Sequence, residues 1–398
     1  MLIQEGLLDG SNGLSELKAG IDGWKFAHGV DSKLVPLLIW CQAPYTVTDS
    51  DASQNWMSEP LGRRLSRRVL TVPALAVASS MGLVIAVVFL PLALLVDLFT
   101  GIRARRLTRI LGLIILLALV HLIYLPAVIV AGPIAWSFPT FGLHLDRWLQ
   151  RTWASVLLRG PCAMLGLPLH EGDGDLPDPA KPVLVFSRHV SVLDVLIPMV
   201  YVAAHGHPRM RYVLKSALKN NALIDLVGQR LPNAFIDRSQ SETSRAAVRR
   251  LGEGLGPAGG VVIYPEGTRA TAARKEKALA RLKSANLDAE WQRAKALRHL
   301  LPPRPAGVLE LLDKSEDAQV CFLAHVGMDR FTGLSDLLAV PRRGEAIKVY
   351  RWVVAREEIP LDREARIEWL WRAWERMDEW IETHRLKPRD EMADQGIA

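Results

Sequence analysis

Two long uncharged stretches dominate the first half of the chain. No charged side chain occurs at residues 70–96, and none occurs at residues 110–131 if His121 is neutral. Each stretch is longer than the roughly 20 apolar residues that cross a bilayer. A pair of buried core helices would be similarly apolar, but core helices of this length usually keep a polar face. The pattern therefore predicts two membrane helices.

Arginine groups lie before the first stretch and between the two stretches. A spanning hairpin would place them on opposite sides of the membrane, against the positive-inside tendency. Two arrangements stay open: a shallow or re-entrant hairpin with both ends on one face, or a spanning hairpin in which one group departs from the tendency. After the second stretch, Trp136, Trp148 and Trp153 predict an interfacial segment. The arginine groups are Arg63, Arg64, Arg67 and Arg68, and Arg103, Arg105, Arg106 and Arg109.

From about residue 181 onward, short β-branched or aromatic runs alternate with segments of helical period. This alternation predicts an α/β fold, with one sheet covered by helices on both faces. The glycines at 252, 254 and 256 follow a helix and precede a strand, so they indicate a helix stop and not a dinucleotide loop. The expected strands are residues 183–186, 212–214, 234–236, 261–264, 320–324 and 347–354, and the expected helices are 192–201, 241–255, 272–300 and 363–384.

The same patterns divide the chain into four parts. Residues 1–60 form an N-terminal extension without an assigned function, and residues 61–135 form the membrane hairpin. Residues 136–385 form the α/β domain, and residues 386–398 are a tail. Because Met57 lies just before the first arginine group, we hypothesise that translation starts there; a native mass that includes residues 1–56 would contradict this.

Composition supports a membrane protein. The 398 residues are 49% hydrophobic, and the mean hydropathy is +0.13. The net charge of +7 suits nucleic acid or anionic lipid, but the arginines flank apolar segments and form no aromatic-studded basic stripe, which favours lipid and argues against nucleic acid. Cys41, Cys162 and Cys321 are far apart, so the sequence predicts neither a disulfide framework nor a metal site, and it fits a reducing compartment.

A histidine and an aspartate follow the first expected strand of the α/β domain. His189 comes directly after the strand, and Asp194 lies five positions later. A carboxylate that orients one imidazole nitrogen leaves the other free to take a proton from an alcohol. The spacing alone is weak, because His170 and Asp175 repeat it in a loop that no strand precedes. Alternatively, residues 191–194 are a helix capping box and His189 is a surface turn residue.

Polar groups also follow two further strands. The strand at 261–264 leads into Glu266, Gly267, Thr268 and Arg269, which offer backbone N–H groups, a hydroxyl and a guanidinium to a phosphate. The strand at 234–236 leads to Arg238. Each cluster alone is equally an ordinary solvated turn or strand end. The three clusters in this order favour one active site at the edge of a sheet.

These motifs resemble the lysophospholipid acyltransferase family, which includes 1-acylglycerol-3-phosphate and glycerol-3-phosphate O-acyltransferases. The matching blocks are His189 to Asp194, residues 235–238 and residues 265–269, and residues 298–304 are similar to the Leu-Leu-Pro-Arg stretch of the longer eukaryotic-type branch. The resemblance covers roughly residues 70–384. The chain departs from the family pattern at Arg188, where Asn is frequent, and at Pro232, where Gly is frequent.

The resemblance implies an acyltransferase-type mixed sheet flanked by helices, preceded by the two membrane helices. It also implies that His189 removes a proton from a glycerol hydroxyl, which attacks an acyl thioester, while Asp194 fixes the imidazole. The residues expected to bind the acceptor's phosphate and glycerol are Arg238, Glu266, Gly267, Thr268 and Arg269, with Lys215 and Arg304 as weaker candidates for phosphate or CoA contacts.

The expected activity is the transfer of a fatty acyl group to lysophosphatidate in phospholipid synthesis. Acyl-CoA or acyl carrier protein would be the co-substrate, and no cofactor is expected. The domain is expected at the membrane, on its cytoplasmic face. The alternatives are a head-group-bearing lysophospholipid as acceptor, a non-catalytic lipid-binding protein of the same fold, and a membrane-anchored hydrolase or phosphatase, for which no metal cluster or nucleophile motif is present.

Overall fold

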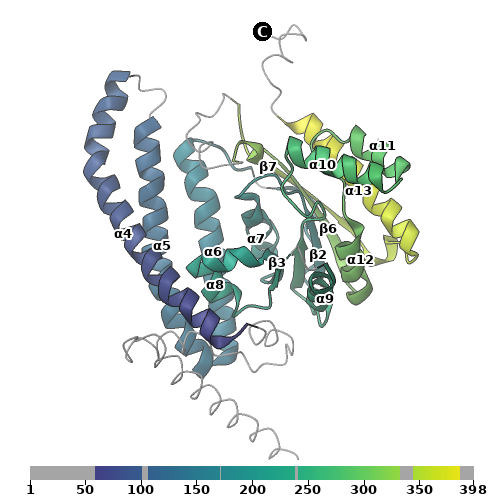
Figure 1. Ribbon diagram of the computed structural model, residues 1–398, viewed down its shortest axis with the longest axis horizontal. Coiled ribbons are helices and arrows are strands. Elements are labelled where there is room, and N and C mark those ends of the chain that lie inside the picture. The colour runs from purple at the N-terminus through teal and green to yellow at the C-terminus, as the bar shows by residue number, and fades with distance from the viewer. Residues whose placement is uncertain (1–58, 101–105, 171, 238–240, 332–343, 386–398) are drawn as a thin grey trace, which may run out of the picture. The chain divides into compact units, whose positions relative to one another are not determined.

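A computed structural model describes residues 59–100, 106–170, 172–237, 241–331 and 344–385 (Figure 1). These residues form two compact units. One unit combines the described residues up to Met81 with His121–Leu149 and Ser216–Asn233, and the other combines Gly82–Val120, Gln150–Lys215 and the described residues from Ala234 onward. The predicted N-terminal extension, the Met57 start and the tail at 386–398 lie outside the described residues. The four-part division of the chain stays a prediction.

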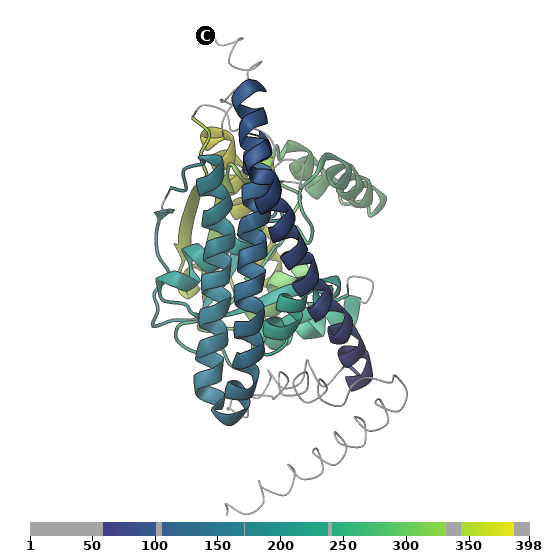
Figure 2. The same cartoon turned by 90° about the vertical axis from the view of Figure 1, so that its left-hand side faces the viewer.

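The two apolar stretches form the long helices α4 (Leu61–Thr100) and α5 (Arg106–Ser137). Both are long and apolar enough to cross a membrane, and only 17% and 28% of their most apolar windows are buried. They are therefore not buried core helices. The two helices run antiparallel (Figure 2): Ser79 Oγ lies 3.4 Å from His121 Nδ1, and the Asp97 carboxylate accepts the backbone N–H of Thr108 at 2.9 Å.

Part of the first arginine group is neutralised inside the protein. Arg68 is 2% exposed and donates from Nε to Asp225 Oδ2 at 2.6 Å, and Arg67 donates to the other oxygen of Asp225 at 2.7 Å. Asp225 lies on helix α8 (Ala222–Gly228). The two arginines are thus held by a buried ion pair with helix α8. Both arrangements of the hairpin stay open.

The described residues of the second unit contain a seven-stranded sheet in the order β1-β7-β6-β2-β5-β3-β4. Strands β6, β2, β5, β3 and β4 are parallel to one another, whereas β7 is antiparallel to β6. The mixed sheet that the sequence predicts is therefore present, with the short β1 in addition. The strands are β1 Asp173–Gly174, β2 Val183–Ser187, β3 Arg209–Lys215, β4 Ala234–Ile236, β5 Gly259–Ile263, β6 Gln319–Val326 and β7 Lys348–Val354.

Helices cover both faces of this sheet. One core contains β-strand residues with side chains of α9 to α13, and the other contains residues of α6 and α7. Phe186 and Phe322 pack edge to face in the first core, and Val185 and Cys321 point into the second, as the alternation of a strand requires. The helices are α6 Pro139–Leu165, α7 Ile197–Tyr201, α9 Ser241–Gly252, α10 Ala272–Ser284, α11 Asp288–Ala296, α12 Pro305–Lys314 and α13 Arg363–His384.

Two predicted helices are wrong in extent. The helix expected at 272–300 is broken between α10 and α11, where Asn286 adopts a left-handed φ of 55°. Asn tolerates that conformation, and Asp288 then favours a new helix start, so the local sequence contains both signals. The helix expected at 192–201 begins as a 3-10 turn at Asp194–Leu196 and becomes α7 only afterwards.

The segment after α11 is anchored by one buried carboxylate. Asp378 on α13 accepts the backbone N–H groups of Arg298, His299 and Leu300 at 2.8–3.0 Å. Three donors that would otherwise compete for water are thereby satisfied in a buried position. The Trp374 indole donates to the Leu301 carbonyl oxygen at 3.0 Å and fixes the next residue.

We expect Asp378→Ala to destabilise the protein by about 2–4 kcal/mol, because it leaves several backbone donors unsatisfied. Thermal unfolding of the detergent-solubilised protein measures this as a lower midpoint. Glu379→Ala is the control, because Glu379 is the exposed next residue of α13. Equal midpoints for the two variants would contradict the anchoring role.

Candidate active site

His189 lies in the loop that leaves the carboxyl end of β2. Its Nδ1 is 2.9 Å from Oδ1 of Asp194, whose side chain is 0% exposed, while the His189 side chain is 15% exposed. Because an ionised carboxylate only accepts hydrogen bonds, Nδ1 carries the proton and donates it. The opposite nitrogen, Nε2, then keeps its lone pair. This is the tautomer that a general base requires.

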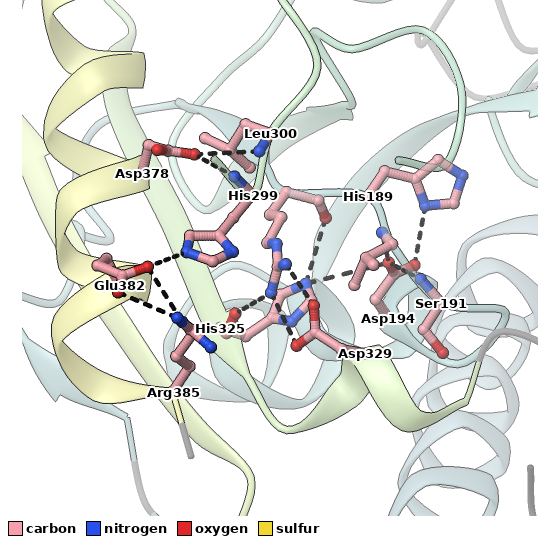
Figure 3. A network of polar contacts seen from close by, with 12 residues as sticks. His189, Ser191, Asp194, His299, Leu300, His325, Asp329, Asp378, Glu382 and Arg385 are labelled. Atoms are coloured by element: carbon pink, nitrogen blue, oxygen red, sulfur yellow. Dashed lines mark hydrogen bonds and ion pairs between the residues drawn. The ribbon is translucent and has the colours of Figure 1, made fainter. Parts of the chain in front are cut away.

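The second oxygen of Asp194 holds the loop itself. Asp194 Oδ2 accepts the backbone N–H of Val190 at 2.5 Å and that of Ser191 at 2.7 Å. Ser191 Oγ donates to the Phe331 carbonyl oxygen at 2.7 Å and accepts from the Leu193 N–H. One half of the capping-box alternative is present, because Asp194 accepts the Ser191 N–H, but Ser191 Oγ accepts from Leu193 and not from Asp194. Figure 3 shows the His189 ring directed at the Asp194 carboxylate, with Ser191 beside Asp194 and its side chain directed away.

The Glu266 carboxyl group links three segments of the site. Its side chain is buried, and its two oxygens accept the backbone N–H of His189 at 2.8 Å and that of Leu301 at 3.1 Å. Both oxygens therefore bind backbone donors of the protein, and the contact of Glu266 with the acceptor stays a prediction. Glu266 joins the loop after β2 and the Leu301 segment to the turn after β5.

Burial raises the pKa of Glu266 to about 8, and the N–H donors from His189 and Leu301 act in the opposite direction. A second link runs from the Ala270 N–H to the His189 carbonyl oxygen at 2.7 Å. The loop after β2 and the turn after β5 are thus tied to each other on both sides of the His189 peptide.

Gly267 allows the turn after β5 to close. Its φ is +67°, and a Cβ at this position would lie 3.1 Å from Cδ of Arg304, so both backbone conformation and space favour glycine. The Arg304 N–H donates to the Pro265 carbonyl oxygen at 2.8 Å. The structure therefore brings Arg304, a weaker sequence candidate, next to the turn. Thr268 in the same turn is half-buried.

A basic cavity of about 380 Å³ adjoins this turn. It is lined by Arg269, by Val190, which follows His189 in the chain, and by the start of α10. Arg274 and Lys277 of α10 line it, and Arg274 also donates to the Arg269 carbonyl oxygen at 3.0 Å. The sequence reasoning missed these two residues. Their spacing of three on one helix was the available signal, because such residues share a face.

Two further sequence candidates lie elsewhere. Lys215 is the exposed last residue of β3, which is separated from β2 by β5. Arg238 lies outside the described residues, so its contact with the acceptor stays a prediction. Among the described residues, no group of His, Cys, Asp or Glu side chains could hold a metal ion.

Tyr264, the residue before Pro265, is a neighbour of the base that the sequence did not single out. Its ring centroid is 4.6 Å from that of His189, so it packs against the imidazole. Burial raises the pKa of the Tyr264 hydroxyl well above its ordinary value, which keeps the hydroxyl protonated. The Tyr264 ring packs on one face of the His189 imidazole, whereas Asp194 contacts the edge of the imidazole at Nδ1.

Comparisons with known proteins agree with this geometry. The acyltransferase family model matches residues 170–302, the stretch that carries His189, Asp194 and the turn after β5. This part of the chain belongs to the acyltransferase family. A lyso-ornithine lipid O-acyltransferase of Rhizobium meliloti (strain 1021) is 30% identical over 153 residues, which are 38% of this chain and 46% of that protein. The match thus spans less than half of the relative. The lysophospholipid acyltransferase family that the motifs predicted is confirmed.

Among solved structures, the 1-acyl-sn-glycerophosphate (LPA) acyltransferase PlsC from Thermotoga maritima matches 63% of this chain and 90% of its own chain. The TM-score is 0.35 and the sequence identity is 12%.

The raised pKa of Glu266 gives the acyltransferase domain a pH-dependent stability. The unfolded chain releases this proton near pH 4.5, whereas the folded state holds it to about pH 8. The stabilisation is fully present below the lower value and is lost as pH rises through the upper one. The Glu266 carboxyl group can lower the free energy of unfolding by at most about 1.4 kcal/mol per pH unit between pH 5 and 8. We expect Glu266→Gln to reduce the decline by up to this amount.

Unfolding midpoints at pH 5, 6.5 and 8 measure this change in slope. Glu276→Gln, an exposed position on α10, is the control and should follow the wild-type slope. Parallel pH profiles for wild type and Glu266→Gln would refute the inference.

Proposed function

We propose that this protein is a membrane-bound O-acyltransferase that transfers a fatty acyl group from a thioester, acyl-CoA or acyl carrier protein, to the free hydroxyl of lysophosphatidate. One observation carries the proposal: the 2.9 Å contact between His189 Nδ1 and Asp194 lies next to a cavity lined by three basic side chains. The dyad supplies a base, and the cavity supplies complementary charge for the acceptor's phosphate.

The chemistry needs no covalent enzyme intermediate. His189 Nε2 takes the hydroxyl proton while the oxygen attacks the thioester carbonyl carbon, and the imidazolium is stabilised by Asp194. The tetrahedral intermediate then expels the thiolate, which takes the proton back from His189. The products are the acylated lipid and the free thiol. The base is neutral at the start and at the end of the cycle.

The acceptor's phosphate would lie in the basic cavity, with Arg269, Arg274 and Lys277 as its ligands. The guanidinium groups can bind phosphate oxygens in pairs, and the lysine adds a point charge. A fixed phosphate orients the glycerol hydroxyl, and positioning of this kind lowers a reaction barrier by several kcal/mol, on the order of 7–11 kcal/mol at most. We further propose that the domain works at the cytoplasmic membrane face, where α4 and α5 give it access to lipid.

A second acceptor is supported by a specific observation. The relative from Rhizobium meliloti is named for lyso-ornithine lipid and is 30% identical to this chain over 153 residues. An acyltransferase for lyso-ornithine lipid is therefore the second candidate. The assay panel that separates the two contains lysophosphatidate, lyso-ornithine lipid and lysolipids with larger head groups, with acyl-CoA and acyl carrier protein as donors and product masses as the readout.

We expect His189→Ala to lower kcat/KM for the accepted lysolipid by about 10²–10⁴-fold, because the hydroxyl loses its base. The measurement is acyl transfer by purified protein in mixed micelles, with expression and membrane insertion unchanged. His170→Ala is the matched control, because His170 repeats the spacing to an aspartate but its described contacts use its backbone. Normal turnover by His189→Ala would exclude the base assignment.

We expect the double variant Arg274→Gln, Lys277→Gln to raise KM for lysophosphatidate by about 10-fold or more with a smaller change in kcat. Two charge-assisted contacts to phosphate are lost, each of about 1.5–3 kcal/mol when fully formed. Lys283→Gln, at the exposed end of the same helix, is the control. An unchanged KM in the double variant would remove the cavity from the acceptor site.

A further inference from the structure

A buried arginine and a buried histidine hold each other behind the catalytic loop. Arg188 Nη1 donates to the His325 carbonyl oxygen at 2.7 Å, and His325 Nε2 lies 3.3 Å from the Arg188 carbonyl oxygen. Both side chains are almost fully buried. We call this reciprocal pair the Arg188–His325 clasp. It joins the loop after β2 to the end of β6.

The clasp also reaches the carboxylate of the dyad. His325 Nε2 is 4.0 Å from Asp194 Oδ2, on the oxygen that does not bind His189. On its outer side, the Arg188 guanidinium donates from both terminal nitrogens to the carboxylate of Asp329, whose side chain is 47% exposed. Figure 3 shows His325, Asp329, Asp194 and His189 in one network of polar contacts.

The protonation state of His325 follows from its surroundings. Burial, and next the charge of Arg188, lower its pKa to about 4, whereas Asp194, Asp329 and the Arg188 carbonyl oppose this shift. The imidazole is therefore neutral at physiological pH. Its contact with a carbonyl oxygen places the single proton on Nε2.

We propose that His325 is a positioning residue for the acyl-transfer reaction: it donates from Nε2 to the Arg188 carbonyl and, through the clasp, fixes the peptide that carries His189. The proposal rests on the proposed function for its kinetic consequence. The backbone polar groups around His189 each have a partner. The Arg188 carbonyl accepts from His325 and, at 3.2 Å, from the hydroxyl of the adjacent Ser187; His325 ties it to β6, whereas Ser187 belongs to the same strand end. The His189 N–H donates to Glu266, and the His189 carbonyl accepts from Ala270.

The clasp matters because Asp194 can hold only the ring and the following loop. The preceding carbonyl sets the direction in which the chain enters His189. If it rotates, the imidazole shifts against the acceptor hydroxyl, and a misplacement of about 1 Å costs on the order of 10²-fold in rate. The position at Arg188, where the family frequently has Asn, is thus linked to a histidine 137 residues later.

The test compares two substitutions at the same position. His325→Leu removes the donor, whereas His325→Gln keeps an amide nitrogen near the place of Nε2. We expect His325→Leu to lower kcat by about 30–100-fold with KM changed by less than about threefold, and His325→Gln to recover at least tenfold of that loss. His207→Leu is the matched control: His207 is also buried against a backbone carbonyl, but it precedes β3, at the amino end of the parallel strands and not at the carboxyl end where His189 lies.

A spectroscopic readout makes the test independent of the substrate. In ¹⁵N-histidine-labelled protein, the His189 signal, assigned by its loss in His189→Ala, should report a single Nδ1–H tautomer. We expect a mixed tautomer in His325→Leu and the single tautomer in His325→Gln. If wild type acylates no lysolipid, the proposed function fails, and this readout still decides the clasp.

A second site keeps the proposal testable if His325→Leu does not fold. Asp329→Asn alters a half-exposed side chain and releases the outer side of Arg188, and we expect kcat to fall about 5–10-fold. Asp313→Asn is its control, because Asp313 is a half-exposed partner of the buried Arg366 far from the loop. The proposal is overturned if His325→Leu or Asp329→Asn keeps kcat within twofold of wild type, or if His325→Gln is no better than His325→Leu.

Discussion

The buried carboxyl group of Glu266 is the constraint on which the rest of the site depends. It is the acceptor for two backbone N–H groups that come from opposite sides, one at His189 and one at Leu301. A carboxyl group in this position carries a desolvation cost, which its raised pKa records. The cost is offset only while both donors stay in place. The loop, the turn and the Leu301 segment therefore form as one assembly, and the rigidity of the base follows from it.

The charges around His189 are arranged in two layers. Asp194 contacts the imidazole directly and is fully buried, so its field acts on the base with little screening. Arg188 lies behind Asp194. Without a counter-charge, its guanidinium would attract the Asp194 carboxylate away from the His189 imidazole. Asp329 supplies the compensating charge on the outer side of Arg188. The neutral His325 adds a hydrogen-bond donor but no charge. Asp194 therefore remains the charged partner of the imidazolium that would form on His189 during the proposed reaction.

The sequence predicted the strands of the sheet closely because each is a compact apolar run, and the predicted strand at 234–236 coincides with β4. Strand ends shifted by one to three residues elsewhere, since they depend on the pairing partner. The inward direction of Glu266 could not be predicted, because its partner Leu301 lies 35 residues further along the chain. The break at Asn286 was present in the local sequence but was hidden by the helical period on either side. Arg274 and Lys277 resemble ordinary solvated residues until the turn places them beside Val190.

The motifs thus combine residues with two opposite orientations. Arg269 lines the cavity and the His189 side chain is 15% exposed, whereas Asp194 and Glu266 are buried and bind backbone N–H groups. A short motif can do both because successive residues at a strand end leave in different directions. This explains why one block of the sequence carries both the chemistry and the scaffold. A residue outside every motif, such as His325, can also act on His189, because it ties the Arg188 carbonyl oxygen to β6, whereas the other donor to that oxygen, Ser187 Oγ, belongs to the same strand end.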